Sequence, residues 1–259
     1  FTPSRFDITK YVQEKDNTLC VRIFQKCTGT WLEDQDMWRF NGIFRDVMIY
    51  KQPDIHIQDL HIDTNIDLDT KKSILTCTCK LTSNELHTLQ TKLYDPQGNI
   101  VWNANMQDTF EIPVENTILW SSEFPNLYQL EIVLYDTNNE ILETIQEQVG
   151  FRKFSLEYGI MKLNGKRIVF HGINRHEWNP KTGRSITSEQ MEEDIHMLKS
   201  LNINAVRTSH YPNNSYWYKL CDQYGIYVID EMNLETHGAN EILPQNKPEW
   251  TDCLLDRAR

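Results

Sequence analysis

The sequence lacks three features that would narrow its class at once: a basic run, a long apolar run and paired cysteines. Its 26 lysine and arginine residues are outnumbered by 37 aspartate and glutamate residues, and the formal net charge is −11. Nucleic-acid affinity depends on clustered lysine and arginine, so we expect no nucleic-acid partner. No apolar run approaches the roughly 20 residues needed to span a bilayer, so we expect no membrane partner either.

The cysteines show neither a Cys-x-x-Cys pair nor a zinc-like spacing with histidine, so all six are predicted to be free thiols. They are Cys20, Cys27, Cys77, Cys79, Cys221 and Cys253. No positively charged start with an apolar segment opens the chain, and the expected location is cytoplasmic. The chain begins with Phe1 and reads as an internal piece, so a signal further upstream stays an open alternative.

Two short apolar runs near the start predict β-strands, because polar clusters bound both of them. They are "TLCVRIF" (18–24) and "IFRDVMIY" (43–50). "KQPD" (51–54) follows and has the composition of a linker. Residues 1–51 are therefore expected to belong to one domain.

Residues 52–150 predict an antiparallel β-sandwich. The strand-like runs are "IHIQDLHI" (55–62), "SILTCTCKL" (73–81), "LQTKLY" (89–94), "IVWN" (100–103), "YQLEIVLYD" (128–136) and "ILETIQEQV" (141–149). "DPQG" and "TNN" join two pairs of these runs with residues that suit turns. About 100 residues is the usual size of an immunoglobulin-like module, and this is the fold we expect.

From about residue 151 the pattern changes to alternating strands and helices, which is typical of a parallel α/β unit. "RIVFHGIN" (167–174) reads as a strand, and "TSEQMEEDIHMLKSLN" (187–202) reads as a helix that starts with a capping box. "INAVRTS", "SYWYKLCDQYG" and "IYVIDEMN" follow as strand, helix and strand, and a third helix begins near "PEWTDCLLDRAR". Three such units cannot close a (β/α)8 TIM barrel, so residues 151–259 are expected to be its N-terminal part.

Polar residues cluster at all three predicted strand ends, where parallel α/β proteins collect their catalytic side chains. The clusters are "NRHE" (174–177), "RTSH" (207–210) and "DEMNLETHG" (230–238). His176 and His210 stand at neighbouring strand ends, and this arrangement favours a functional role over a structural one. Arg207 either positions a substrate or pairs with a barrel carboxylate.

Two further residue pairs can each be interpreted in two ways. Glu235 and His237 lie two apart, so in an extended segment they point the same way and either share a metal ion or are structural. Ser209 beside His210 suggests a serine nucleophile, but adjacent strand residues face opposite ways and the chain has no Gly-x-Ser-x-Gly. A serine hydrolase is therefore rejected.

The segment "WLEDQDMWRFNGIFRDV" (31–47) combines acids with tryptophans. Three carboxylates, Asp36 among them, lie between Trp31 and Trp38. Carboxylates beside indoles match the hydroxyls and the apolar face of a sugar. A solvated acidic loop anchored by two core tryptophans is the alternative interpretation.

These blocks together resemble glycoside hydrolase family 2, and within it the β-galactosidases of the large bacterial type. "NAVRTSHYPNNSYWYKLCDQYGIYVIDE" resembles the strand-helix-strand signature of that family, and "NGKRIVFHGINRHEW", "DEMNLETHG" and "WSSEFPNLYQL" match further blocks. "LEDQDMWR" favours β-galactosidases over glucuronidases and mannosidases. The resemblance implies the end of a jelly-roll sugar-binding domain (1–51), an immunoglobulin-like β-sandwich (52–150) and the first part of a barrel (151–259).

The resemblance also implies roles for particular residues in a galactosyl pocket. His176 and His210 would hold galactosyl hydroxyls and stabilise the transition state. Arg207 would shape the same pocket. These three residues are the expected catalytic and substrate-binding groups of the chain.

Two bound cations follow from the resemblance as well. Glu235 and His237 would be ligands of a catalytic Mg²⁺, and Asp36 would reach a bound Na⁺ and the 6-hydroxyl of the sugar. The sequence departs from the pattern at Trp178, where many relatives have histidine, and at Met232, where a small residue is common. Neither residue is an expected ligand, but both affect the rim of the pocket.

The implied activity is hydrolysis of terminal non-reducing β-D-galactose residues, as in lactose, with retention, by a parent protein expected to be a homo-oligomer. Retaining glycosidases need two carboxylates about 5 Å apart, and the family places both on later barrel strands than this chain contains. The chain is therefore expected to be an internal fragment that is inactive alone. Another family 2 glycosidase (β-glucuronidase or β-mannosidase) and a non-catalytic sugar-binding fragment, with Trp31, Trp38 and Asp36 as its platform, stay open.

Overall fold

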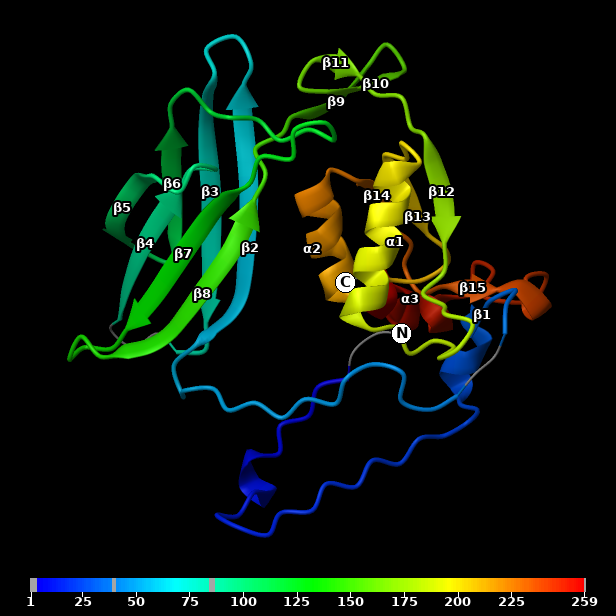
Figure 1. Cartoon of the computed structure of the whole chain (residues 1–259). Helices are drawn as coiled ribbons and strands as arrows, with labels where there is room; N and C mark the ends of the chain where they lie inside the picture. Colours follow the sequence, from blue (N-terminus) through cyan, green and yellow to red (C-terminus); the bar gives the residue numbers. More distant parts are fainter. Residues whose placement is uncertain (1–3, 39–40, 84–86, 259) are drawn as a thin grey trace. The chain divides into compact units, whose positions relative to one another are not determined.

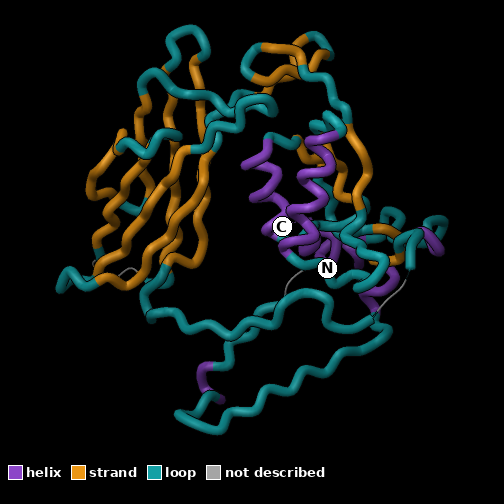
Figure 2. Tube along the Cα trace, in the orientation of Figure 1, coloured by secondary structure: helices purple, strands orange, loops and turns teal. Residues whose placement is uncertain are grey.

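The computed structural model describes residues 4–38, 41–83 and 87–258, and it divides the chain into two compact units (Figure 1). The first unit comprises residues 1–47, 172–218 and 228–259, and the second comprises residues 48–171 and 219–227. Strands dominate the second unit, whereas the first combines helices, short strands and long loops (Figure 2). Within the described ranges, no helix has the length and apolarity needed to cross a membrane.

The second unit contains a sandwich of two antiparallel sheets, which confirms the predicted immunoglobulin-like fold. The strands are β2 (Ile57–Asp67), β3 (Lys72–Leu81), β4 (Thr88–Tyr94), β5 (Ile100–Met106), β6 (Thr109–Val114), β7 (Tyr128–Tyr135) and β8 (Ile141–Val149). One sheet has the order β2-β3-β6 and the other β5-β4-β7-β8. The sequence did not predict β6, because Pro113 within it argues against a strand.

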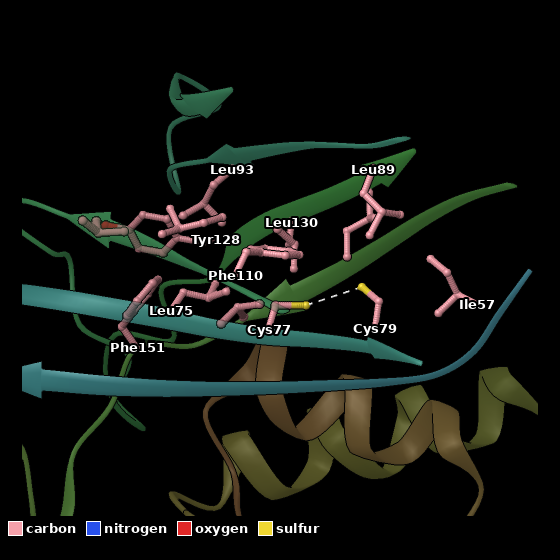
Figure 3. Close-up of a cluster of buried hydrophobic side chains, with 14 of the residues drawn as sticks. Ile57, Leu75, Cys77, Cys79, Leu89, Leu93, Phe110, Tyr128, Leu130 and Phe151 are labelled. Carbon is pink, nitrogen blue, oxygen red and sulfur yellow. Dashed lines mark hydrogen bonds between the residues drawn. The ribbon is translucent and has the colours of Figure 1, made fainter. Parts of the chain in front are cut away.

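Alternating side chains of both sheets form the sandwich core. Along β3, Leu75, Cys77 and Cys79 are buried while their neighbours are more exposed, as the two-residue period of a strand requires. Figure 3 shows these residues beside core side chains of the opposite sheet. Phe151 packs edge-on against Tyr128, with ring centroids 4.8 Å apart. All six cysteines are free thiols, as predicted.

The segment of residues 219–227 belongs to this second unit through two close contacts. The Trp120 indole N–H donates a hydrogen bond of 2.8 Å to the carbonyl of Asp222. Gly225 has a φ of +72°, and a Cβ there would collide with the Ser122 carbonyl oxygen. Only glycine fits at this position, because the approach is to backbone and the conformation is left-handed.

The first unit contains the predicted start of a parallel α/β fold. Its elements are β12 (Gly172–Arg175), α1 (Ser188–Ser200), β13 (Ala205–Thr208) and α3 (Thr251–Ala258). Helix α2 (Ser215–Tyr224) and strand β14 (Tyr227–Ile229) complete the pattern, and each includes residues of the segment 219–227. The strands form a sheet in the order β12-β13-β14, and β12 and β13 are parallel. Strands β12 and β14 are shorter than their sequence patterns predicted. An antiparallel sheet of β9 (Phe154–Glu157), β10 (Ile160–Leu163) and β11 (Lys166–Arg167) precedes them in the chain and belongs to the second unit.

Helix α1 starts at the capping box that the sequence predicted. The Thr187 hydroxyl accepts a hydrogen bond from the Gln190 backbone N–H, and the Gln190 side chain accepts one from the Thr187 N–H. Met191, Ile195 and Leu198 are buried on one face of the helix. The 3.6-residue period therefore places this face against the core.

The two strands predicted near the start of the chain are wrong. The structure has no strand over residues 18–24 or 43–50. Leu19 and Val21 of the first run are each more than half exposed. A strand needs a neighbouring strand to satisfy its backbone N–H and C=O groups, and none of the described residues pairs with these runs. The described part of this region forms η1 (Thr9–Tyr11), η2 (Thr28–Trp31) and β1 (Glu33–Asp34).

Candidate active site

The parallel register of β12 and β13 brings the first two polar clusters together. Asn174 lies opposite Arg207, and Arg175 lies opposite Thr208. The alternation buries Arg175 and Thr208 and leaves Asn174 and Arg207 on the other face of the sheet. The Arg207 guanidinium comes within 3.5 Å of the Asn174 side-chain oxygen.

Arg175 is a structural residue, although it lies in the first cluster. Its guanidinium donates two hydrogen bonds, of 3.0 and 2.8 Å, to one oxygen of Asp194 and one of 2.8 Å to Asn213. It also stacks 3.7 Å from the centroid of the buried Trp217 ring. These contacts hold a buried charge in place, so Arg175 is not available to a ligand.

Glu231 connects Arg207 and His210. The His210 Nδ1 atom lies 2.8 Å from Glu231 Oε2, and the Arg207 Nε atom forms an ion pair with Glu231 Oε1. Arg207 and His210 also approach each other, with 3.4 Å between Nη2 and Nδ1. All three side chains are partly exposed, so the group borders solvent while its members fix one another. Arg207 therefore does pair with a carboxylate, and it does so inside the polar cluster.

A second set of hydrogen bonds holds the backbone of Glu231. The Thr208 hydroxyl accepts from the Glu231 N–H at 3.0 Å and donates to Asp230 at 2.8 Å. The Tyr218 hydroxyl donates to the same Asp230 oxygen at 2.6 Å. Burial is the main cause that raises the pKa of Tyr218, and the Asp230 carboxylate adds to it. Tyr218 therefore stays a neutral donor.

The imidazole ring of His176 lies edge-on to that of His210, with centroids 5.6 Å apart and planes at 82°. This confirms that the two strand-end histidines come together. Loss of hydration is the largest cause that lowers the pKa of His176, followed by the nearby His210 and Arg184. The lowered pKa favours the neutral form of His176. The Tyr211 hydroxyl lies 3.5 Å from its Nδ1 and accepts a hydrogen bond from the Glu177 N–H.

The third cluster lies beside the acidic segment of residues 31–47. Strand β1 pairs in parallel with β15 (Glu235–Thr236), so Glu33 lies opposite Glu235. The Arg257 guanidinium is 2.9 Å from the Glu33 carboxylate. The Asp34 carboxylate accepts a hydrogen bond of 2.9 Å from the Gly238 N–H, and a Cβ at Gly238 would lie only 2.7 Å from that oxygen.

The structure brings Asp36 close to the predicted pair of Glu235 and His237. The His237 Nδ1 atom is 3.5 Å from Glu235 Oε1, and its Nε2 atom is 3.9 Å from Asp36 Oδ2. The Glu235 Oε2 atom is buried and has no hydrogen-bond partner among the described residues. A buried carboxylate oxygen without a donor fits a cation, since it would otherwise keep a desolvation cost. Within the described ranges, however, no set of three or more His, Cys, Asp or Glu side chains is arranged to hold a metal.

Gln35 is a buried residue of the candidate site that the sequence analysis did not identify. Its side-chain NH₂ donates to the His210 carbonyl at 3.1 Å and to the Asn233 side-chain oxygen at 3.2 Å. Gln35 and Asn233 are both buried. Gln35 thus joins the second and third polar clusters. Nothing in the local pattern around Gln35 marks a partner 175 residues away.

The sequence analysis did not identify Arg45 either, because its partners are also distant in the chain. Its guanidinium lies 2.7 Å from a Glu177 oxygen and 2.7 Å from the Pro212 carbonyl. The other Glu177 oxygen accepts a hydrogen bond from the Asn214 N–H. Glu177 is therefore a buried carboxylate whose two oxygens are both engaged, and it serves the structure of the site.

Trp31 and Trp38, the two tryptophans of the expected platform, do not stack on each other in the structure. Trp38 stacks on Trp178, with centroids 4.9 Å apart and planes 22° apart, and not on Trp31. Trp31 ends the short helix η2 and is half-exposed. The alternative of two core tryptophans is wrong, because neither Trp31 nor Trp38 is buried.

Ser209 does not have the surroundings of a nucleophile. It is buried, and its hydroxyl lies 3.4 Å from the Arg175 carbonyl oxygen. The Nδ1 atom of His210 contacts Glu231 instead. A nucleophilic serine needs a base within hydrogen-bond reach, and these contacts agree with the rejection of a serine hydrolase.

Family models match the chain in three consecutive stretches. Residues 1–53 match the sugar binding domain of glycosyl hydrolases family 2, residues 55–152 match a second domain of the same family, and residues 154–259 match its TIM barrel domain. The chain belongs to glycosyl hydrolase family 2. This membership confirms the resemblance seen in the sequence and the expected order of folds.

Curated relatives within family 2 align with the whole chain. A β-galactosidase of Halalkalibacterium halodurans is 49% identical over 100% of this chain and 27% of its own length. A β-galactosidase of Clostridium acetobutylicum is 44% identical over 100% of this chain and 30% of its own length. A β-galactosidase large subunit of Lactobacillus acidophilus is 42% identical, and the match covers 44% of its length. The chain thus spans between about a quarter and a half of these family 2 relatives.

Solved family 2 structures share the fold at lower identity. A β-glucuronidase of Bacteroides uniformis matches with a TM-score of 0.69 and 26% identity over 76% of this chain and 25% of its own. A β-glucuronidase of Ruminococcus gnavus, in complex with D-glucaro 1,5-lactone, matches with a TM-score of 0.63 and 28% identity over 69% of this chain and 30% of its own. The β-galactosidases named above are more similar in sequence to this family 2 chain than these two glucuronidases are.

Proposed function

We propose that the chain is part of a β-galactosidase, here called the parent, that releases terminal non-reducing β-D-galactose, as from lactose, with retention of configuration. The observation that carries the proposal is the group of Arg207, His210 and Glu231, with His176 beside it, at the ends of neighbouring strands. Whole-length similarity to curated β-galactosidases supports galactose as the sugar. The domain boundaries 1–51, 52–150 and 151–259 are proposed with it.

The two histidines supply hydrogen bonds to the galactosyl ring. Because Nδ1 of His210 faces Glu231, its Nε2 atom is the one that contacts a sugar hydroxyl. The lowered pKa of His176 favours its neutral form, whose ring can donate to one group and accept from another. Hydroxyl contacts that strengthen in the oxocarbenium-like transition state lower the barrier by several kcal/mol in glycosidases. Arg207 keeps the pocket in shape by holding Glu231.

The nucleophile and the acid/base are proposed to lie outside these 259 residues. The carboxylates near the histidines already have structural partners: Glu177 pairs with Arg45, and Glu231 pairs with Arg207 and His210. Glu235 lies against His237. A retaining mechanism needs two carboxylates that face the scissile bond, in addition to those already engaged here. The 259-residue chain alone is therefore expected to be inactive.

Mg²⁺ and Na⁺ are the proposed cofactors. The unpaired Glu235 oxygen and the adjacent His237 would hold Mg²⁺, and the exposed Asp36 carboxylate would hold Na⁺. Two protein ligands leave most positions around Mg²⁺ to water or to other groups, which is usual for this ion. When bound, the ions would supply positive charge close to the developing charges of the reaction.

Two proposals concern the setting of the parent. All six cysteines are free thiols, and three of them are exposed, which supports the cytoplasm, a reducing compartment. The homo-oligomeric state rests on the family alone. Light scattering of the purified parent would measure it directly.

Hydrolysis of three matched nitrophenyl glycosides tests the function. The parent is expected to cleave the β-D-galactoside much faster than the β-D-glucuronide or the β-D-mannoside, and the 259-residue chain is expected to cleave none of them. Preference for the glucuronide, which the solved family 2 structures make the main rival, would replace the galactosidase proposal. Turnover by the isolated chain that is lost on His210→Ala would show that the carboxylates do lie within it.

A sugar-binding role without catalysis is the other candidate, and the exposed Trp38–Trp178 stack favours it. Calorimetry with D-galactose separates it from the proposal. Binding that disappears on Asp36→Ala, in a parent that hydrolyses no galactoside, would support the binding role.

A further inference from the structure

Two cysteines of strand β3 bring their thiols together in the core of the sandwich. Cys77 and Cys79 lie two residues apart on one strand, so their side chains leave the same face of the sheet. Their Sγ atoms are 4.0 Å apart, within the distance of an S–H···S hydrogen bond (Figure 3). Both side chains are buried. The core therefore holds two thiols that face each other.

The surroundings of the two thiols are apolar. On the neighbouring strands, Ile62 and Phe110 lie opposite Cys77. All the side chains that form this core belong to residues 55–151, which include both sheets of the sandwich. The burial of the thiols therefore comes from the sandwich itself and does not depend on the rest of the parent.

The hydrogen bond between the thiols makes them unequal in acidity. It raises the pKa of Cys77 and lowers the pKa of Cys79. Burial acts on both thiols in the direction of a higher pKa, because a thiolate loses its hydration in the core. A second thiolate in this core therefore needs a positive partner.

Charge and ligand number decide which ion the two thiols can hold. Two thiolates around a divalent cation carry no net charge, which avoids the cost of an unpaired buried charge. Thiolates are soft ligands, whereas Mg²⁺ and Ca²⁺ prefer oxygen. Among the described residues, no third His, Cys, Asp or Glu joins the pair in a metal-binding group. Zn²⁺ usually takes four ligands, so the ion that fits is soft and satisfied by two, as Hg²⁺ is.

The two sulfurs are close enough to share one ion. A metal–thiolate bond of the length found for Zn²⁺ is about 2.3 Å, so two such bonds reach across at most about 4.6 Å. The separation of 4.0 Å lies within this reach. Binding replaces two S–H bonds by two metal–sulfur bonds and releases two protons, with no change of oxidation state. Strand β3 lies between β2 and β6, so the ion enters through local opening of the sandwich, and uptake is slow.

We propose that Cys77 and Cys79 form a binding site for a soft divalent cation of the Hg²⁺ class, held between two thiolates in the sandwich core. The site shares no residue with the proposed galactosyl pocket or with the proposed Mg²⁺ and Na⁺ ligands. The proposal therefore does not rest on the proposed function.

Retention of Hg²⁺ by the full-length parent in excess glutathione tests the proposal. Glutathione carries one thiol and removes Hg²⁺ from single cysteines, whereas a pair of thiols holds the ion by two bonds. After long incubation with Hg²⁺ and gel filtration, elemental mass spectrometry gives the mercury bound per chain. Cys77→Val and Cys79→Val, which keep an apolar β-branched side chain in the strand, are each expected to bind one ion fewer than the wild type. Cys221→Ala, at a buried cysteine of α2, is the matched control and is expected to bind as many ions as the wild type.

Three results would overturn the site. Equal mercury content in the wild type and the two valine variants would show that the pair holds no ion. A loss in Cys221→Ala as large as in the valine variants would show that facing thiols are not required. Collapse of the near-UV circular dichroism of the wild type on loading would show that the unfolded sandwich, and not its packed core, binds the ion. Cys77→Ala replaces Cys77→Val if the valine variant lacks the native near-UV signal.

Discussion

The β-sandwich and the group of polar side chains around Arg207, His210 and Glu231, here called the polar cluster, are held together by opposite kinds of contact. Within the sandwich, the pairs β2–β3, β4–β5 and β7–β8 are neighbours in the chain, and the core is almost entirely apolar. In the cluster, Gln35 reaches His210 and Arg45 reaches Glu177 across 175 and 132 residues, through hydrogen bonds and ion pairs. The local sequence pattern determines the sandwich, whereas the polar cluster forms only when segments that are distant in the chain meet. Stability and activity should therefore respond to different substitutions.

The largest expected effect is a loss of stability in the sandwich. Phe151 is fully buried against Tyr128, so Phe151→Ala should lower the free energy of unfolding by about 3–5 kcal/mol, because it leaves a cavity. Urea denaturation of the 259-residue chain measures this loss. Phe154→Ala, at a ring that is 59% exposed, is the control and should cost far less. Similar losses for the two variants would contradict the packing described here.

The second effect separates catalysis from stability. His210→Ala in the parent should lower kcat for a galactoside about 10²–10³-fold, the usual loss for one donor to a transition state. Stability should change little, because the His210 side chain is partly exposed. His196→Ala, at an exposed histidine on α1, should leave kcat unchanged. Unfolding of the His210→Ala parent at a clearly lower temperature would mean that His210 is structural.

Gln35→Ala tests whether the long-range contacts hold the cluster together. The change removes the donor to the buried Asn233 oxygen and to the His210 carbonyl, which should cost about 1–3 kcal/mol. We expect galactosidase activity and stability to fall together, unlike in His210→Ala. Gln97→Ala, at an exposed turn of the sandwich, should change neither activity nor stability. An unaffected Gln35→Ala parent would show that the cluster forms without this bridge.

A smaller effect is expected at the start of α1. Thr187→Ala removes the side-chain acceptor for the Gln190 N–H and should cost about 1 kcal/mol, whereas Thr187→Ser keeps the cap. Thermal unfolding of the 259-residue chain compares the two variants. Equal melting temperatures would show that the capping box adds nothing measurable.

The smallest effect concerns His176 and pH. Burial and the neighbouring charges hold the pKa of His176 below 6.5, the ordinary value. The unfolded chain therefore takes up this proton at a higher pH than the folded chain does, so the contribution to stability is present above pH 6.5 and is lost as the pH falls below it. Titration of the His176 ring by NMR should give a midpoint below 6.5. A midpoint above 6.5 would mean that a nearby carboxylate outweighs burial.

The sequence predicted best where local chemistry decides structure. The capping box of Thr187 and Gln190 needs only neighbouring residues, and this prediction was right. The strand predicted over residues 73–81 was right for the same reason, and it forms β3. Histidines at two adjacent strand ends could be brought together because parallel strands end at one edge of a sheet.

Prediction failed where the outcome depends on a partner elsewhere in the chain. Residues 18–24 have the apolar pattern of a strand but no neighbouring strand among the described residues, so they do not form one. The stack of Trp38 on Trp178 and the hydrogen bonds of Gln35 join segments more than 100 residues apart. No periodicity or spacing in the sequence encodes such pairs. Strand β6 was not predicted because Pro113 lies within it, and proline is rare inside strands.

The most direct test of the polar cluster as a galactoside site is the position of D-galactose in a crystal of the parent. The account predicts sugar hydroxyls within about 3.2 Å of the His210 Nε2 atom, the His176 ring and the Asp36 carboxylate. Galactose bound away from all three residues, with the histidines contacting only protein, would contradict the account.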